Sequence, residues 1–379
     1  MIKTIYLDNF KSLVDFQIKL NKFNCLIGLN GAGKTTILQA LEFLSQLTIG
    51  NLDFWLEKRN WKKSDLKNKQ SHKSNISFNV VLDIDGEELN WNGEFNRTDL
   101  YCSKESITVN GEILLNVEKR TYTLENNGKF NIQFDYQGSI LSQLNLDKFP
   151  KILQHLKKDL RTIRSLELLA PHLLRQSARP QFKNIGVGGE RLSAFLSQLS
   201  HKQKSSIENK LKEFYPNFSQ YRIESMRGGW KKLSVTENYP LKHYSFQDID
   251  SNHINDGILR ILAILAQLQT NDNFILFDEI ENGINPEIIE KLVDTLVNTS
   301  QQIMVTTHSP MILNYLEDEL ASKSVILVYK TPEGFTRSQH FFDIPMLKEK
   351  LTIMGPGEAF IDTYLEDLVA DLNKQEESV

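Results

Sequence analysis

A glycine-rich run between an apolar segment and a helix-like segment constrains the fold of this chain more than any other feature. The run is Gly28-Leu-Asn-Gly-Ala-Gly-Lys-Thr35, and it matches the pattern GxxxxGK[ST] at every fixed position. Apolar residues fill positions 23–27 before it, and apolar residues recur at helical spacing over 37–47 after it. The sequence therefore predicts a strand, a loop and a helix, which is the context in which such a loop binds phosphate.

The residue types in this loop suit the binding of a nucleoside triphosphate. Glycines allow backbone angles that other residues avoid, so consecutive N–H groups can point at phosphate oxygens together with the start of the helix. We expect Lys34 to reach the β- and γ-phosphates and the hydroxyl of Thr35 to bind Mg²⁺. The residues predicted to contact ATP here are Asn30, Gly31, Gly33, Lys34, Thr35 and Thr36.

A second apolar run ends in two carboxylates about 240 residues further along the chain. Residues 274–277 read Phe-Ile-Leu-Phe and are followed by Asp278 and Glu279, which is the Walker B pattern. We expect Asp278 to hold the Mg²⁺ shell and Glu279 to polarise the attacking water. A strand followed by an ordinary acidic turn is the alternative for this segment taken alone.

A histidine follows a third apolar run. His308 lies in Thr306-Thr-His-Ser-Pro310, directly after a predicted strand at 303–305. A neutral imidazole at this position can donate to a γ-phosphate and orient water, whereas the alternative is a histidine that only caps a strand. Lys34, Glu279 and His308 are the candidate catalytic residues.

The rest of the chain alternates between strand-like and helix-like segments. Residues 76–137 alternate with period two, and turn signals at Asp85-Gly86, Asn92-Gly93, Asn110-Gly111 and Asn127-Gly128 predict antiparallel hairpins. A helical pattern is expected over 141–169, a hairpin over 221–237, and alternating helices and strands over 258–329. Such alternation predicts a mostly parallel sheet.

Composition restricts the class of protein. The 379 residues include 44 Lys and Arg against 48 Asp and Glu, and 40% are hydrophobic. This balance excludes a polybasic nucleic-acid wrapper and a disordered chain. Cys25 and Cys102 lack the spacing of a disulfide framework or a zinc site. No apolar run has the length of a membrane span, so we expect a reducing, cytoplasmic location and no membrane contact.

Four motifs together resemble those of ABC-type ATPases. LDNFKS near the N-terminus, GLNGAGKTT, FDEIENGINP and TTHSP are similar to the soluble branch that includes RecF, SMC heads and OLD-like proteins, with the PtuA-like defence ATPases as one example. The resemblance is strong over residues 1–50 and 240–320. It implies a P-loop head that pairs with a second head around two ATP molecules.

The resemblance also implies a signature loop that completes the partner's site. The corresponding stretch is residues 254–260, in which Asn255 stands where the family usually has Ser and Gly257 allows close backbone approach. A helix N-terminus capped by Asn255 or Asp256 is the alternative. Gln133 and Gln137 are candidates for the family's Q-loop glutamine by position only.

The predicted architecture is an α/β ABC-type ATPase head with a mostly parallel sheet, an antiparallel β subdomain and a helical insertion. The predicted parts are an N-terminal lobe at 1–140, a mainly helical lid at 141–230 and a C-terminal lobe at 231–379. Since the phosphate loop and the acidic strand end must share one site, residues 1–320 are predicted to form one discontinuous head.

The predicted role is an ATPase, with ATP and Mg²⁺ as ligands, that pairs with itself and controls a separate effector such as a nuclease or toxin in bacterial defence against phage. A RecF-like ATPase of DNA repair or replication and, less well matched, a nucleotide-binding subunit of a transporter are the alternatives. The stretch from Lys58 to Lys73 carries seven cationic side chains with Trp61 among them. It is either a DNA contact or a solvated mobile loop.

Overall fold

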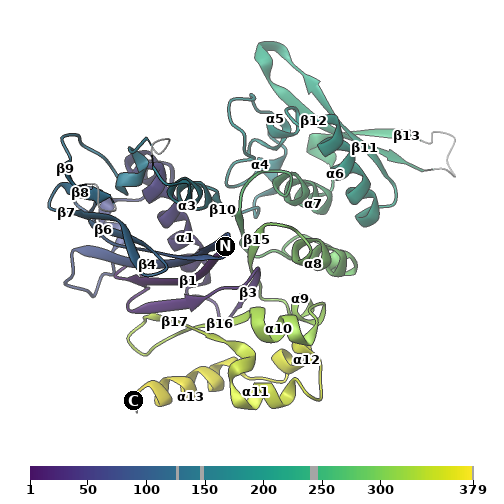
Figure 1. Cartoon of the computed structure of the whole chain (residues 1–379). Helices are drawn as coiled ribbons and strands as arrows, with labels where there is room; N and C mark the ends of the chain where they lie inside the picture. Colours follow the sequence, from purple (N-terminus) through teal and green to yellow (C-terminus); the bar gives the residue numbers. More distant parts are fainter. Residues whose placement is uncertain (125–127, 146–148, 240–245, 378–379) are drawn as a thin grey trace. The chain divides into compact units, whose positions relative to one another are not determined.

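The computed structural model describes residues 1–124, 128–145, 149–239 and 246–377, which form two compact units (Figure 1). Unit 1 contains Met1–Arg164 and Glu317–Val379, and unit 2 contains Ser165–Leu316. The unit boundaries thus fall at different positions from the lobe boundaries at 140 and 230 that the sequence suggests, and the three lobes stay a prediction.

Unit 1 contains an eight-stranded antiparallel sheet in the order β2-β1-β4-β5-β6-β7-β8-β9. Its strands are β1 (Ile2–Asp8), β2 (Phe16–Lys19), β4 (Asn75–Ile84), β5 (Glu87–Asn96), β6 (Tyr101–Val109), β7 (Glu112–Glu118), β8 (Thr121–Leu124) and β9 (Lys129–Asn131). Along β4 every second side chain is buried, which confirms the period of two. The antiparallel subdomain predicted from the sequence is therefore present.

Two of the predicted hairpin turns form where expected and one does not. Asp85-Gly86 and Asn110-Gly111 join neighbouring strands with positive φ at all four residues. The turn predicted at Asn92-Gly93 is wrong, because both residues lie inside β5. Gly93 is needed there for space: a Cβ would lie 2.7 Å from Cζ of Phe78 and 2.8 Å from the carbonyl of Lys104. Asn127 lies outside the described residues.

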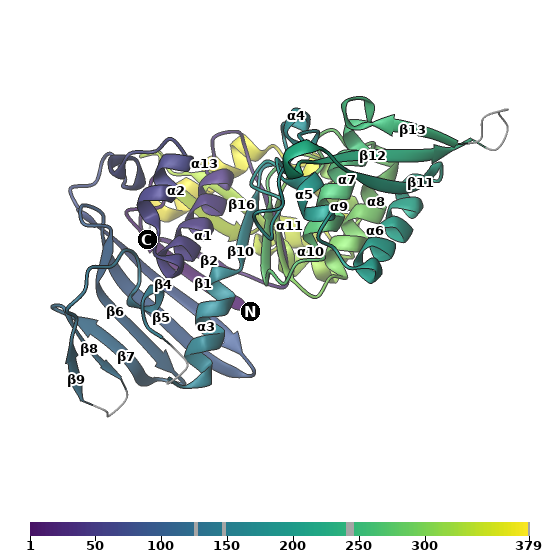
Figure 2. The same ribbon diagram turned by 90° about the horizontal axis from the view of Figure 1, so that it is seen from above.

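Helices cover the buried face of this sheet. They are α1 (Lys34–Ile49), α2 (Leu52–Lys58), η1 (Lys63–Leu66), η2 (Ile140–Ser142) and α3 (Lys151–Arg161). Figures 1 and 2 show α1 and α3 side by side. The ring of Phe43 on α1 stacks on Phe10 at 5.1 Å and meets Phe95 of β5 edge-on at 5.2 Å. This aromatic contact fixes the helix that follows the glycine loop onto the sheet.

A second set of strands in unit 1 carries the glycine loop. β3 (Phe23–Ile27) is fully buried and pairs in parallel with β16 (Val325–Lys330), which pairs antiparallel with β17 (Thr336–His340). The remaining elements of this part are α10 (Asp318–Ser324), η7 (Phe341–Asp343), α11 (Pro345–Lys350), α12 (Pro356–Ile361) and α13 (Leu365–Glu377). Residues from both ends of the chain therefore build the loop's surroundings.

Unit 2 carries the acidic strand end. β14 (Phe274–Phe277) pairs in parallel with β15 (Gln302–Thr306) and neighbours β10 (Ile163–Leu166). The helices are α4 (Pro171–Leu174), α5 (Leu192–Leu196), α6 (His201–Phe214), η5 (Ser251–His253), α7 (Asp256–Gln267), η6 (Pro286–Ile288), α8 (Ile289–Val297) and α9 (Pro310–Asn314). The helix expected over 141–169 is wrong for 163–166, a short run that is buried as a strand; residues 146–148 of it lie outside the described part.

A three-stranded antiparallel sheet completes unit 2. β11 (Phe218–Ser225) and β12 (Lys231–Asn238) form the hairpin predicted from the sequence, with η4 (Arg227–Gly229) at its turn, and β13 (Phe246–Asp250) pairs with β12. Figures 1 and 2 show these three strands side by side, with α6 next to β11. Across the described ranges, no helix is both long and apolar enough to cross a membrane.

Candidate functional site

The glycine loop joins β3 to α1 as the sequence predicts. Gly28, Gly31 and Gly33 all have positive φ, at 145°, 76° and 112°. α1 begins at Lys34 with Gly33 as its N-cap, and no side chain caps it. The Lys34 ammonium is folded back over the loop, where it donates to the carbonyls of Gly28 at 2.8 Å and Leu29 at 3.1 Å. The loop is thus shaped as a cradle around a buried cation.

The exposed side of this loop carries the residues predicted to meet phosphate and metal. Asn30, Gly31 and Thr35 are exposed, whereas Thr36 is half-buried. These exposed residues lie directly before and in the first turn of α1. The first N–H groups of a helix have no partner within the helix, so the loop has the form that binds phosphate groups.

A residue of the C-terminal segment braces the loop, a role that no pattern around it in the sequence indicates. Thr336, the first residue of β17, is fully buried and donates its hydroxyl to the carbonyl of Ala32 at 3.1 Å. The same hydroxyl shares a hydrogen bond with Ser12 at 2.8 Å. A Cβ on Gly33 would lie 2.3 Å from it. Thr336 therefore fixes the loop to a strand about 300 residues away in the sequence.

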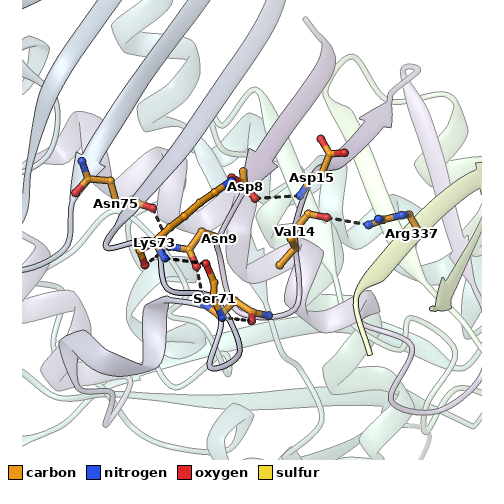
Figure 3. A network of polar contacts seen from close by, with 9 residues as sticks. Asp8, Asn9, Val14, Asp15, Ser71, Lys73, Asn75 and Arg337 are labelled. Carbon is orange, nitrogen blue, oxygen red and sulfur yellow. Dashed lines mark hydrogen bonds and ion pairs between the residues drawn. The ribbon is translucent and has the colours of Figure 1, made fainter. Parts of the chain in front are cut away.

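The LDNFKS stretch forms the strained turn between β1 and β2. Asn9, Lys11 and Asp15 have φ of 67°, 50° and 48°, which is uncommon for residues with a side chain. Figure 3 shows the polar network that supports this turn: Asn9 donates to the carbonyls of Lys73 and Asn75, at 2.9 and 2.8 Å. Further contacts in the network are the ion pair of Asp8 with Lys73 and the bond from the backbone N–H of Asp15 to Asp8.

The basic stretch from Lys58 to Lys73 is hydrogen-bonded to this turn through Asn68, and both the DNA contact and the solvated mobile loop stay predictions. Asn68 donates to the carbonyl of Lys11 at 2.6 Å. Its Oδ1 accepts from the backbone N–H groups of Gln70 and Ser71, which forms a turn. The ammonium of Lys11 lies 3.3 Å from the ring centre of Trp61. These contacts surround a surface hollow of about 470 Å³ that is lined by basic and polar side chains.

One of the two Q-loop candidates, Gln137, lies away from the glycine loop. Oε1 of Gln137 accepts from the N–H groups of Leu52 and Asp53, at 2.8 and 3.2 Å, and so caps α2. This contact lies beyond the C-terminal end of α1, and a 16-residue helix is about 24 Å long. Gln133 is exposed. Gln137 is a structural cap in this fold.

The acidic strand end in unit 2 is held by one buried hydroxyl. Thr306, at the end of β15, donates to Oδ1 of Asp278 at 2.6 Å and accepts from the backbone N–H of Glu279 at 2.8 Å. Glu279 has a φ of 45°, a left-handed conformation. Asp278 is buried and Glu279 is half-buried. The Walker B carboxylates thus lie at the end of a parallel strand, as predicted.

The segment after Glu279 contacts the predicted sensor histidine. Oε1 of Glu281 accepts from the backbone N–H of His308 at 2.9 Å, and Asn282 donates to Oε2 of Glu279 at 3.3 Å. His308 is exposed, and Ser309 caps α9 as predicted. Glu279 and His308 are therefore linked through Glu281 and Asn282 within unit 2.

The signature-like loop lies against the same segment. Asn255 is the N-cap of α7, and its Oδ1 accepts from the N–H of Gly257 at 2.8 Å, so the capping alternative describes its present contact. A Cβ on Gly257 would lie 2.7 Å from the hydroxyl of Tyr215 and 3.3 Å from the carbonyl of Gly283. A larger residue would require Tyr215 to shift, which favours glycine at this position.

Two arginines fix the signature-like loop: Arg175, which the sequence did not indicate, and Arg260, the last residue of the stretch itself. Arg175 donates to the carbonyl of Ile254 at 2.8 Å and pairs with Asp256, on either side of Asn255. Arg260 is buried on α7 and donates to the carbonyl of Glu279 at 3.3 Å. Burial lowers the pKa of the Arg260 guanidinium, and among the nearby carboxylates Glu281 raises this pKa most strongly.

The comparisons with known proteins agree with this geometry. A family model described as "AAA domain, putative AbiEii toxin, Type IV TA system" matches residues 23–314, which is more than half of the chain. The chain belongs to this family. The matched range of this AbiEii-type AAA domain includes the glycine loop, the signature loop, the acidic strand end and His308. Among curated proteins, none is significantly similar.

Solved structures similar to the AbiEii-type AAA domain are SMC heads. The SMC head domain from Thermotoga maritima is 14% identical with a TM-score of 0.51, over 89% of this chain and 98% of that one. An SMC head bound to the C-terminal winged-helix domain of ScpA is 16% identical with a TM-score of 0.57, over 90% and 98%. The fold is therefore that of the ABC-type P-loop ATPase head, as predicted.

Proposed function

We propose that this chain is a Mg²⁺-dependent ATPase that closes head to head with a second copy around ATP and controls a separate effector protein. The observation that carries the proposal is the glycine loop itself. It has the full phosphate-binding pattern, lies between a buried strand and a helix, and folds over a buried lysine. Family membership supports nucleotide hydrolysis as the reaction.

The residues present fit a nucleotide and its metal. Asn30, Gly31 and Gly33 would hold the phosphates with their backbone N–H groups, and Lys34 would exchange its carbonyl partners for phosphate oxygens. Thr35 and Asp278 are the residues that would hold Mg²⁺, with a hydroxyl and a carboxylate as its preferred oxygen ligands. When bound, the ion neutralises charge on the phosphate oxygens.

The acidic strand end would prepare the attacking water. Glu279 would accept a proton from that water or orient it, and His308 would donate to the γ-phosphate. Phosphoryl transfer needs positioning and charge stabilisation more than covalent chemistry. The contacts of Glu281 and Asn282 with these two residues support a preorganised pair.

The head pair rests on the signature loop. In the proposed closed state Asn255 and Gly257 of one copy would complete the ATP site of the other, so that ATP binding favours the pair and hydrolysis releases it. Asn255 already caps α7 with its oxygen, and its amide NH₂ is the group that would donate to a γ-phosphate.

The effector and the setting are the most distant part of the proposal. The family description names a toxin and a type IV toxin–antitoxin system, which supports a defence role; a cytoplasmic location is part of the proposal. One of the similar SMC heads is bound to a partner protein, ScpA, and a partner nuclease or toxin is the analogous proposal for this chain. The basic stretch from Lys58 to Lys73 is proposed as a DNA contact because it carries seven cations and is hydrogen-bonded through Asn68 to the turn at Lys11.

Measurement of ATP hydrolysis and ATP binding in two variants tests the activity. Lys34→Ala should lose nucleotide binding, because its ammonium has no substitute in the loop. Glu279→Gln should bind ATP normally and slow turnover by roughly tenfold or more, since an amide cannot take the proton. Normal affinity in Lys34→Ala or unchanged turnover in Glu279→Gln would remove that residue from its proposed role.

A further inference from the structure

Asp278 and Glu279 are neighbours at the end of β14, and their proposed roles differ. In unit 2 the hydroxyl of Thr306 is hydrogen-bonded to both residues. Thr306 has no exposed surface. Its Oγ1 donates to the Asp278 carboxylate at 2.6 Å and accepts from the N–H of Glu279 at 2.8 Å, and its carbonyl accepts from the N–H of Ile280 at 3.2 Å. Consecutive residues 278, 279 and 280 are therefore all bonded to this one threonine.

These bonds act on a strained piece of backbone. Glu279 has a φ of 45°, which is costly for a residue with a Cβ and persists only where the surroundings enforce it. The bond from its N–H to Thr306 and the bond from Arg260 to its carbonyl hold the peptide groups on both sides. The left-handed conformation follows directly after Asp278, at the residue proposed to meet the attacking water.

Threonine suits this task better than other small residues. Its β-branch restricts χ1 on a strand, which fixes the direction of the hydroxyl. A hydroxyl is also the smallest group that donates and accepts at the same atom. Valine has the same shape without either capacity, and it would leave the N–H of Glu279 without this acceptor.

We propose that Thr306 is a positioning residue that sets Asp278 for the metal and Glu279 for the water. This inference rests on the proposed ATPase function and deepens it. The competing explanation is that Thr306 only satisfies buried polar groups, in which case its loss would affect folding and not the dependence of the reaction on metal.

The chain offers a matched control for this distinction. Thr236 on β12 is 2% exposed and donates to Oδ1 of Asp248 at the same 2.6 Å, in the three-stranded sheet. Thr236→Val therefore removes from unit 2 a hydrogen bond between a buried threonine and an exposed aspartate, without touching the acidic strand end. Any loss common to Thr236→Val and Thr306→Val is structural.

The experiment compares Thr306→Val, Thr306→Ser and Thr236→Val with the wild type in kcat, KM for ATP and the Mg²⁺ concentration for half-maximal hydrolysis. Thr306→Val should lower kcat by about tenfold or more and raise the Mg²⁺ requirement several-fold, with KM nearly unchanged. Thr306→Ser should recover most of the activity, and Thr236→Val should behave as the wild type. Thr306→Val with wild-type kcat and Mg²⁺ dependence would overturn the proposal, as would an equal loss in Thr236→Val.

A second readout separates this inference from the proposed function. Mn²⁺ binding in the presence of a non-hydrolysable ATP analogue, titrated by electron paramagnetic resonance, should be several-fold weaker in Thr306→Val. A wild type that binds Mn²⁺ and the analogue but never hydrolyses ATP would refute the ATPase proposal and leave this comparison decisive for Thr306. Should the valine variant fail to fold, Thr306→Cys, with a weak donor and acceptor, should fall between serine and valine in both readouts; equality with serine would contradict the proposal.

Discussion

A methyl group added to Gly33 should disable the glycine loop, whereas the same change at Gly31 should cost only the backbone strain. Both residues have positive φ, at 112° and 76°, so alanine strains the backbone at either position by about 1–3 kcal/mol. At Gly31 a Cβ meets nothing within 4 Å. At Gly33 it would lie 2.3 Å from Oγ1 and 2.9 Å from Cγ2 of Thr336, so Thr336 must move.

The size of the difference follows from what Thr336 would lose. Displacement breaks its hydrogen bonds with Ala32 and Ser12, at about 1 kcal/mol each. The extra cost of about 2 kcal/mol corresponds to roughly a 30-fold loss of ATP affinity beyond that of Gly31→Ala, because the loop must hold this shape to bind phosphate.

Equilibrium titration with a fluorescent ATP analogue measures this difference. In a Thr336→Ala background the steric part is removed, so adding Gly33→Ala should then cost no more than Gly31→Ala costs in the wild type. Equal affinities of Gly33→Ala and Gly31→Ala would refute the claim that Thr336 braces the loop.

Two further predictions concern residues outside the loop. Burial raises the pKa of Glu105 above its ordinary 4.5, although Ser139 and Trp91 donate to its carboxylate; its contribution to stability is therefore full below pH 4.5 and is lost as the pH rises through the raised value. In urea unfolding, the free energy of the wild type relative to Glu105→Gln should fall with rising pH, and a constant difference would contradict this. Arg175→Ala removes the donor to the carbonyl of Ile254 and the ion-pair partner of Asp256. The ATP-dependent pairing of heads, measured by sedimentation, should therefore weaken about tenfold, while each head binds ATP as before. Unchanged pairing would show that Arg175 does not position the signature loop.

The parts of the site that were predictable from the sequence are those in which local sequence decides local geometry. The glycine loop, the apolar strand that ends at Asp278 and the Ser309-Pro310 helix start each combine a short pattern with its own backbone requirement. The structure gives all three as expected. The turns at Asp85-Gly86 and Asn110-Gly111 followed the same logic, whereas at Asn92-Gly93 close packing and not a turn requires glycine.

The parts that were not predictable depend on residues brought together by the tertiary fold. Thr336 contacts a loop about 300 positions away, and Arg175 contacts a helix start about 80 positions away. Nothing in the residues around either one marks such a role. Gln137 shows the converse, because its position along the chain suggested a Q-loop while its contacts make it a cap of α2.

Native mass spectrometry of Glu279→Gln with Mg²⁺ and ATP tests the central claim most directly. If ATP closes two heads and Glu279 is needed to release them, this variant should appear as a dimer that carries two ATP molecules, and Lys34→Ala under the same conditions should remain a monomer without nucleotide. A Glu279→Gln protein that stays a nucleotide-free monomer at saturating ATP would contradict the account.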